Sequence, residues 1–263
     1  MRVADAGAAG QLPEASPPGA HSAVRRALRA EVERARERRA GLPVRVLDVG
    51  GGSGVWAVPM AVAGCQVTVV DTSPNALAAL RRRARDAGVQ EQVTATQGDV
   101  QALADSVPAG GADLVLGHGL LEVVDDVAAS VGQLAEAVEP GGAVSVLVAG
   151  RHGAALALAH AGRLAQARTV LSDPGGRSGP ADKLQRRLDL AGLRGLLESV
   201  AQLSIELVQG EGVFDGWLPA AVLEADPAGA DELSRIVAST PELLVLAAQL
   251  HVLARRPAAE PPG

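Results

Sequence analysis

A glycine-rich turn is the first place in this chain where residue type and spacing could do chemistry. Residues 46–54 read Val-Leu-Asp-Val-Gly-Gly-Gly-Ser-Gly, an apolar run that leads directly into the turn. Glycine tolerates positive φ and lets a ligand lie against bare backbone, and a helix beginning near Val55 would offer unpaired N–H donors. The turn therefore predicts a site for a nucleotide-like ligand, lined by Gly50, Gly51, Gly52 and Gly54.

A carboxylate stands at the end of the next apolar run. Asp71 follows Gly50 by 21 residues. An aspartate at the carboxyl end of the second strand can accept hydrogen bonds from both ribose hydroxyls of an adenosine. Glycine-rich turns and strand-end aspartates are each common, but the two together on neighbouring strands indicate a ligand site.

The turn differs from two familiar phosphate-binding motifs. A dinucleotide site requires G-x-G-x-x-G, and Val55 stands where the third glycine would be. A Walker loop is excluded as well, because no Lys-Ser/Thr pair follows the glycines. Asp48, two residues before the first glycine, would repel a pyrophosphate and attract a cation. S-adenosylmethionine fits this pattern, since it combines an adenosine with an α-ammonium and a sulfonium and carries no phosphate.

Short β-rich runs alternate with longer Ala/Leu/Arg segments in the first part of the chain. We expect strands over 44–49, 66–71, 92–97, 113–118 and 143–148, and helices over 22–39, 55–63, 74–87 and 127–138. This alternation implies βαβ units and a mostly parallel sheet. Because the strands are continuously apolar, both faces of the sheet should be covered.

The pattern changes after Gly150. Helical segments at 152–171 and 183–200 flank a Gly/Pro-rich loop at 173–180, and a helix at 227–238 separates the last two strands at 203–208 and 250–255. We interpret residues 21–257 as a single domain, with a helical cap formed by about 151–182 and 210–248. Residues 1–20 and 258–263 read as loose tails.

Composition excludes several classes of protein. The 24 basic and 30 acidic residues give a net charge of −6, which offers no global support for a nucleic-acid binder. The longest apolar runs fall far below the roughly 18 residues of a membrane span, and no secretory signal is visible, so we expect a cytoplasmic chain without a membrane partner. The single cysteine excludes an internal disulfide, and the five histidines are not spaced as metal ligands, so no metal is expected.

The order of five motifs resembles that of class I S-adenosylmethionine-dependent methyltransferases. These motifs are residues 48–54, Asp71, and residues 97–100, 113–118 and 139–142. The resemblance implies an α/β, Rossmann-like fold with a seven-stranded, mostly parallel sheet and an antiparallel last strand. It also implies that the glycines line the cofactor, that Asp71 holds the ribose, and that Asp99 and Val100 contact the adenine.

A narrower resemblance is to the bacterial tRNA 5-carboxymethoxyuridine methyltransferases. It rests on residues 117–126, 152–153 and 250–257 and on the helix around Arg25. It implies that Arg25 pairs with the cofactor carboxylate, that His118 lines the cofactor pocket, and that a carboxylate on a wobble uridine is esterified. The chain departs from that family at Gly150 and Gly212, and aromatic residues that could stack on a base are scarce.

Several acceptors therefore stay open. An RNA-borne carboxylate or a small acidic metabolite is already ionised, so positioning could supply most of the acceleration. For a small molecule methylated on a hydroxyl or amine, His118 or Glu122 would be the nearest candidates to take the proton. A non-catalytic module that binds S-adenosylmethionine is the third hypothesis. The candidates for holding an anionic acceptor are the basic residues of the expected cap, Arg177, Lys183, Arg186 and Arg187.

The helix expected over 22–39 carries seven arginines interleaved with three glutamates. Such a pattern is typical of a solvated helix held by i,i+4 Glu/Arg pairs, and we favour this interpretation over contact with an RNA backbone.

Overall fold

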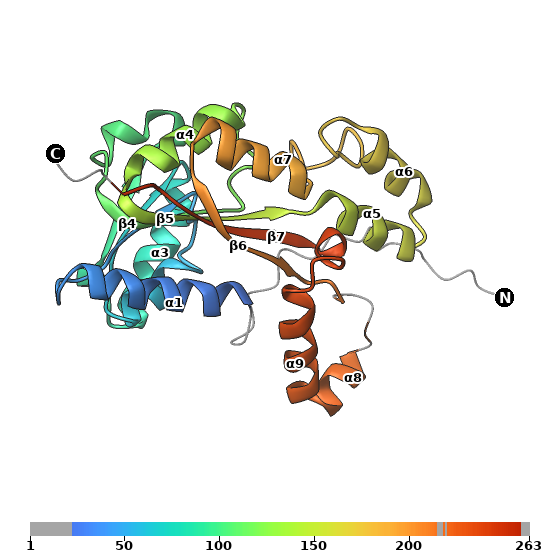
Figure 1. Ribbon diagram of the computed structural model, residues 1–263, viewed down its shortest axis with the longest axis horizontal. Helices are drawn as coiled ribbons and strands as arrows, with labels where there is room; N and C mark the ends of the chain where they lie inside the picture. The colour runs from blue at the N-terminus through green and yellow to red at the C-terminus, as the bar shows by residue number, and fades with distance from the viewer. Residues whose placement is uncertain (1–22, 215–217, 219, 259–263) are drawn as a thin grey trace.

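A seven-stranded sheet forms the centre of the computed structural model, which describes residues 23–214, 218 and 220–258 (Figure 1). Its strand order is β3-β2-β1-β4-β5-β7-β6. β7 is antiparallel to both of its neighbours, whereas the remaining pairs are parallel. The strands are β1 (Arg45–Val49), β2 (Gln66–Asp71), β3 (Val93–Gln97), β4 (Ala112–His118), β5 (Val138–Ala149), β6 (Ser204–Glu211) and β7 (Gln249–Arg255). The predicted mostly parallel sheet with an antiparallel last strand is confirmed.

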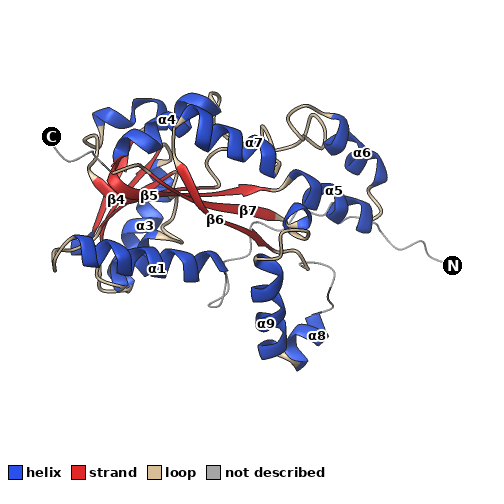
Figure 2. Ribbon diagram, viewed as in Figure 1, coloured by secondary structure: helices blue, strands red, loops and turns tan. Residues whose placement is uncertain are grey.

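Helices cover both faces of the sheet (Figure 2). One face carries α1 (Ala23–Arg38), α2 (Ala57–Val62) and α3 (Pro74–Asp86); the other carries α4 (Val127–Ala137), α7 (Leu190–Gly195) and the π-helical turn η3 (Leu196–Val200). Short 3-10 turns are η1 (Gln90–Gln92), η2 (Val100–Asp105) and η4 (Leu244–Leu246).

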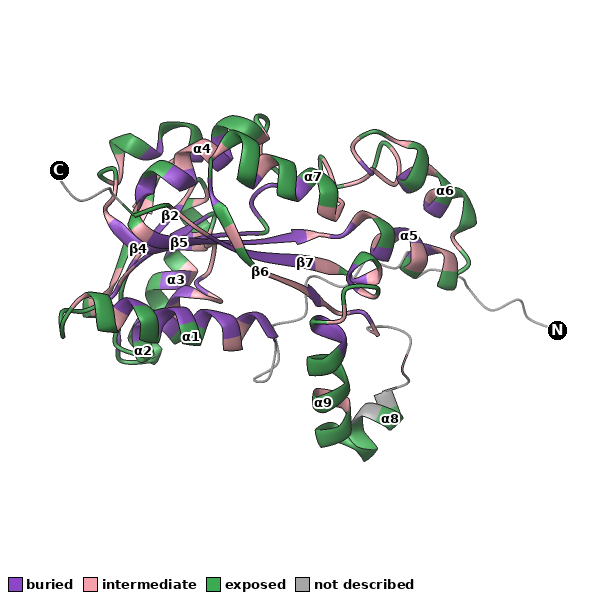
Figure 3. Ribbon diagram, viewed as in Figure 1, coloured by how far each residue is buried: buried purple, intermediate pink, exposed green. Residues whose placement is uncertain are grey.

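Each covered face has its own hydrophobic core. Leu114 and Leu116 of β4 face the α1 side, where they join Leu28, whereas Val115 faces the α4 side, where it joins Leu134. All seven residues of β4 are buried as a result, and Figure 3 shows the buried strands between two layers whose outer surfaces are exposed. Burial on both faces explains why the strand sequences are continuously apolar instead of alternating.

The segment after β5 differs from the expected single helix. It folds into α5 (Arg151–His160) and α6 (Leu164–Ser172), separated by a turn at Gly162, whose φ is +73°. The helix expected from residue 183 begins only at Leu190, because the Asp189 carboxylate caps it by accepting a hydrogen bond from the Gly192 N–H at 2.8 Å. Capping side chains such as this set helix ends that periodicity alone does not reveal.

The segments expected to form one cap build two separate helical hairpins. α5 and α6 extend beyond the carboxyl end of β5. α8 (Ala220–Ala225) and α9 (Pro227–Ala238) form the other hairpin, near the start of α1 (Figure 1). The expected tails lie outside the described residues, apart from Ala258, which is exposed. None of the described helices is long and apolar enough to cross a membrane.

Candidate functional site

The glycine turn follows β1 and is attached to the end of β2. Gly50, Gly52 and Gly54 have φ values of +71°, +55° and +81°. The Gly50 N–H donates to the Val70 carbonyl at 2.7 Å. A Cβ on Gly54 would overlap Leu80 of α3, so this glycine lets the two segments pack closely. α2 begins at Ala57, two residues after the expected start.

Asp48 lies buried beneath this turn. Its side chain is 1% exposed, and neither carboxylate oxygen has a hydrogen-bond partner in the described part of the chain. A Cβ on Gly51 would lie 2.5 Å from the Asp48 carboxyl carbon, so the turn backbone rests on this group. Burial, together with the charge of Asp71, raises the pKa of Asp48 to about 7. A buried, unpartnered carboxylate is costly, and a cationic ligand held by the turn would compensate it.

Asp71 is oriented by the backbone around it. Its Oδ2 accepts a hydrogen bond from the Gly52 N–H at 2.9 Å, and its Oδ1 accepts one from the Ser73 N–H at 2.8 Å. The side chain is half-buried. Each carboxylate oxygen retains a lone-pair site, so the group can still accept hydrogen bonds from two hydroxyls.

The turn after β3 joins the same edge of the sheet. The Gly98 N–H donates to the Asp71 carbonyl at 3.2 Å. Asp99 then caps η2 by accepting from the Gln101 N–H at 2.8 Å, while Val100 is buried behind it. The turns that follow β1, β2 and β3 thus meet, and with them the glycines, Asp71, Asp99 and Val100.

Three side chains from distant segments form a second part of the site, the Arg25–Trp56–His118 cluster. The guanidinium carbon of Arg25 lies 5.4 Å from the centre of the Trp56 ring, within cation–π range. The Trp56 and His118 rings meet edge to face, with centroids 4.7 Å apart. The structure therefore brings α1, the glycine turn and the end of β4 together. Trp56 was not among the predicted site residues, and the available signal was its place two residues after Gly54.

His118 is buried at the end of β4. Its Nε2 lies 2.8 Å from the Ser145 hydroxyl, and its Nδ1 has no hydrogen-bond partner among the described residues. Burial, with a smaller contribution from His251, lowers the pKa of His118 well below 6.5. The imidazole is therefore neutral near pH 7. One of its nitrogens then has a lone pair that can accept a hydrogen bond, and the ring is poorly suited to act as a general acid.

Glu122 joins the loop after β4 to the end of β5. Its Oε1 accepts a hydrogen bond from the Ala149 N–H at 2.7 Å, while its Oε2 is buried and has no partner within the described ranges. Burial raises the pKa of this carboxyl group. A carboxylate with a raised pKa and an unused oxygen is suited to receive a proton.

The basic residues of the 173–189 loop differ in their surroundings. Arg187 is buried, and its Nη1 lies 2.5 Å from Asp182, whose carboxyl pKa it helps to lower. Arg186 donates to the backbone carbonyl of Leu121 at 2.8 Å. Arg177 is half-buried and Lys183 is exposed. Arg187 thus pairs within the loop, whereas Arg186 joins the loop to the segment after β4. A contact of any of the four predicted residues with an acceptor stays a prediction.

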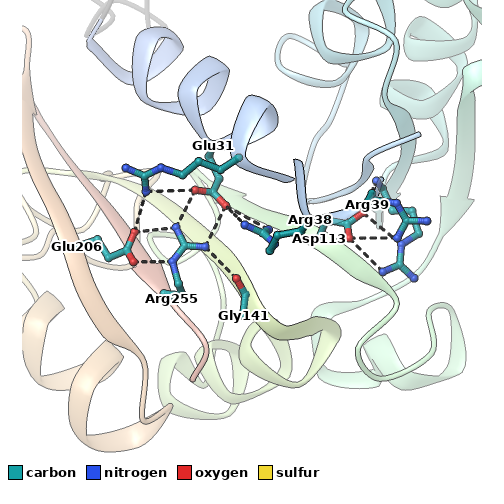
Figure 4. Close-up of polar contacts among 9 residues, drawn as sticks. Glu31, Arg38, Arg39, Asp113, Gly141, Glu206 and Arg255 are labelled. Carbon is teal, nitrogen blue, oxygen red and sulfur yellow. Dashed lines mark hydrogen bonds and ion pairs between the residues drawn. The ribbon is translucent and has the colours of Figure 1, made fainter. Parts of the chain in front are cut away.

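The arginines of α1 pair with carboxylates of the helix itself and of other elements. Arg34 lies 3.2 Å from Glu206 of β6. Arg39, which directly follows the helix, lies 3.2 Å from Asp113 of β4 (Figure 4). Within the helix the pairs are i,i+3 or longer, as between Arg36 and Glu33. Paired arginines were expected, but their partners show that this helix packs on the sheet. Across residues 23–214, 218 and 220–258, no group of three His, Cys, Asp or Glu side chains could hold a metal ion.

The chain is similar in sequence to known methyltransferases. The family model described as a methyltransferase domain matches residues 20–198. Among curated proteins, a ubiquinone biosynthesis O-methyltransferase from Xanthomonas euvesicatoria pv. vesicatoria is 36% identical over 118 residues, covering 45% of this chain and 48% of that protein. A tRNA 5-carboxymethoxyuridine methyltransferase from Escherichia coli K12 is 33% identical over 110 residues, covering 42% of each. The chain spans about half the length of the curated relatives it matches.

Solved structures share the fold. An S-adenosylmethionine-dependent methyltransferase from Mesorhizobium loti superimposes with a TM-score of 0.53 at 22% identity, covering 83% of this chain and 95% of that one. Magnesium protoporphyrin IX methyltransferase from Synechocystis PCC 6803, solved with bound SAH, gives a TM-score of 0.55 at 18% identity, with 88% and 82% covered. At these identities the likeness concerns the fold alone.

Proposed function

The chain belongs to the methyltransferase-domain family of S-adenosylmethionine-dependent proteins, and from this premise we propose that it methylates a hydroxyl group of a small molecule. When bound, S-adenosylmethionine supplies a methyl group on a positively charged sulfur, already activated for transfer. The chain's task is then to hold the cofactor, align the acceptor and take its proton.

The proposed cofactor site lies where the turns after β1, β2 and β3 come together. The Asp71 carboxylate would bind the ribose hydroxyls, and Asp99 and Val100 would contact the adenine. Asp48 would offset the positive charge of the ligand, since both of its oxygens lack partners among the residues described. Arg25 would bind the methionine carboxylate.

The choice of a hydroxyl acceptor rests on the position of Glu122. It stands between the carboxyl ends of β4 and β5, with one oxygen held by the Ala149 N–H and the other unused. A hydroxyl acceptor can donate its proton to such a carboxylate, and general-base catalysis of this kind contributes about 10²–10⁴-fold. A carboxylate acceptor would instead be repelled by it. In this proposal Glu122 takes the proton and His118 stays neutral.

The surroundings of the site support a small acceptor. A hollow of about 590 Å³ lies on the α5–α6 hairpin, beyond the carboxyl end of β5. Its wall is mainly apolar, with His152, Arg168 and Ser172 as polar members. Small-molecule sites commonly have such a volume and such a lining. Several of the curated relatives are small-molecule O-methyltransferases by name.

A carboxylate on a tRNA wobble uridine is the second candidate. It is favoured by the similarity to the E. coli tRNA methyltransferase and by the motifs around His118 and His251. The charge distribution gives it less support, because the chain carries a net charge of −6, Arg186 binds the backbone of the segment after β4, and Arg187 pairs with Asp182.

The test is methyl transfer from methyl-labelled S-adenosylmethionine to separated small-molecule and RNA fractions of a cell extract. We expect label in the small-molecule fraction as a product that resists mild alkali, because an ether survives conditions that hydrolyse a methyl ester. Label released from tRNA by alkali would favour the wobble carboxylate. Cofactor binding without transfer to either fraction would favour a non-catalytic module and overturn the proposal.

A matched pair of variants tests the role of Glu122. Glu122→Gln keeps an oxygen for the Ala149 N–H but cannot take a proton, so kcat should fall about 100-fold with little change in S-adenosylhomocysteine affinity. Glu136→Gln, at an exposed position on α4, should leave kcat unchanged. Equal rates for Glu122→Gln and the unmodified protein would remove Glu122 from the reaction.

A further inference from the structure

A row of four polar side chains crosses the neighbouring strands β4, β5, β7 and β6, on the face of the sheet that α1 covers. Gln209 of β6 lies 3.1 Å from the Nδ1 of His251 on β7; the Nε2 of His251 lies 2.9 Å from the Ser145 hydroxyl on β5; and that hydroxyl lies 2.8 Å from the Nε2 of His118 on β4. Ser145 and His251 are fully buried. We call these four residues the relay.

The direction of donation in the relay follows from the orientation of the Gln209 amide. In this orientation the carbonyl oxygen of Gln209 faces the Nδ1 of His251 and only accepts, so the proton of His251 lies on Nδ1. Burial lowers the pKa of His251 to about 3, so its ring is neutral and its Nε2 carries a lone pair. That nitrogen accepts from the Ser145 hydroxyl, whose oxygen in turn accepts from the Nε2–H of His118. His118 is neutral too, so its Nδ1 is left with a lone pair.

That lone pair belongs to a ring that packs next to the glycine turn. The His118 ring contacts Trp56, which follows this turn, edge to face with centroids 4.7 Å apart, while its Nε2 is held by Ser145 of β5. His118 is only 9% exposed, and its Nδ1 has no partner in the part of the chain that the structure describes. A buried acceptor without a donor is costly, so a ligand donor is expected there.

The Arg25–Trp56–His118 cluster suggests what that donor is. An α-amino acid carries its ammonium and carboxylate on one carbon, so the groups that bind them must lie close together. The cluster provides a guanidinium from Arg25 for a carboxylate and the lone pair of His118 for an ammonium, and both residues contact Trp56.

We propose that Gln209, His251 and Ser145 are positioning residues, which hold His118 in the tautomer with a lone pair on Nδ1 so that it accepts a hydrogen bond from the α-ammonium of the bound cofactor. The inference rests on S-adenosylmethionine as the cofactor of the proposed function, and it does not depend on the acceptor. Reversing the relay would turn an N–H toward the ammonium and replace attraction by repulsion.

Nitrogen NMR of the protein labelled with ¹⁵N-histidine and saturated with S-adenosylhomocysteine tests the tautomer directly. We expect the Nδ1 of His118 to resonate as an unprotonated nitrogen and its Nε2 as a protonated one, with the opposite pattern in His251. A proton on the Nδ1 of His118 would overturn the proposal. The His118 signals are assigned by their loss in His118→Gln.

Ligand affinities test the function of the relay. S-adenosylhomocysteine carries the ammonium and carboxylate, whereas 5′-methylthioadenosine lacks both. In Ser145→Ala and in Gln209→Leu, S-adenosylhomocysteine affinity measured by calorimetry should fall about tenfold, the value of one hydrogen bond, with 5′-methylthioadenosine affinity unchanged. Ser145→Thr keeps the hydroxyl and should restore the ratio of the two affinities.

Ser130→Ala is the matched control, because Ser130 is an equally buried serine on α4 whose hydroxyl donates to the Asp126 carbonyl. Its ratio of affinities should equal that of the unmodified protein. An unchanged ratio in Gln209→Leu, whose half-buried site tolerates substitution better than Ser145, would overturn the inference. A protein that binds S-adenosylhomocysteine with the expected tautomer but methylates no acceptor would overturn the proposed function and leave this inference standing.

Discussion

Asp48 has an ionisable carboxyl group that nothing in the described chain neutralises. Burial raises its pKa from 3.8 to about 7. The native protein therefore binds more protons than the unfolded chain between these two values, and the free energy of unfolding contributed by this group decreases as the pH rises through that window. A cationic ligand acts in the opposite sense, because it favours the ionised carboxylate.

We therefore predict that S-adenosylmethionine affinity increases as the pH rises from about 5 to about 7, while the stability of the ligand-free protein decreases as the pH rises from about 4 to about 7. Asp48→Asn should bind the cofactor more weakly and lose this part of both pH dependences. Calorimetric titration and urea unfolding at several pH values measure the two effects. Parallel pH curves for the variant and the unmodified protein would contradict a role for Asp48.

Arg25 allows a second prediction at the scale of one residue. Arg25→Ala should weaken S-adenosylhomocysteine binding about tenfold and leave 5′-methylthioadenosine binding unchanged, because only the first ligand has a carboxylate for the guanidinium. Arg29→Ala is the control, since Arg29 is exposed on the same helix. An equal loss for both ligands would assign Arg25 another task, such as holding Trp56 in place.

The residues that meet around the glycine turn could be predicted to lie together because they follow one another at the ends of consecutive strands. Trp56 and the relay could not. Ser145 is an isolated polar residue in an apolar stretch of β5, Gln209 is one of several polar residues of β6, and His251 is distant from Ser145 and Gln209 in sequence. Only the pairing of β5, β6 and β7 brings these three together.

At the scale of elements, the close approach of the glycine turn to α3 gives a prediction about stability. Gly54→Ala would force a left-handed backbone on alanine and push its Cβ into Leu80, which is fully buried. We expect a loss of about 1–3 kcal/mol in the free energy of unfolding. Gly132→Ala, inside α4, meets no atom within 4 Å and should stabilise the protein by about 0.5–1 kcal/mol. Urea unfolding separates the two, and a stable Gly54→Ala protein would show that the turn can move.

Element types followed well from the sequence, whereas some boundaries did not. The strands lie where apolar runs predict them, because burial on both faces demands such runs. The break between α5 and α6 was missed, since Gly162 stands within an Ala/Leu-rich segment whose composition favours helix on either side. Asp189 was missed for a different reason: an aspartate becomes a cap only where the next N–H groups turn toward it.

At the scale of the whole molecule, a network of charges joins the first described helix to the last strand (Figure 4). The fully buried carboxylate of Glu31 on α1 accepts from Arg255 of β7 at 2.7 Å, and Arg255 also contacts Glu206 of β6 and donates to the Gly141 carbonyl. Segments more than 200 residues apart are held together in this way.

Glu31→Gln should therefore lower the free energy of unfolding by about 3 kcal/mol, because it removes the fully buried carboxylate with which the half-buried Arg255 pairs. Added salt should reduce this difference little. Glu33→Gln on the same helix removes an exposed ion pair and should change stability by less than about 1 kcal/mol. Similar losses for both variants would mean that the network contributes no more than a surface pair.

The position of β7 has a consequence for how the protein is made. Among the strands that the structure describes, β6 pairs only with β7, and β7 is the later of the two to leave the ribosome. During synthesis, β5 therefore keeps one open edge and β6 stays without a strand partner until residues 249–255 emerge. The nascent chain can assemble β1 to β5 early. The relay, which includes His251 of β7, can form only when translation has passed Arg255.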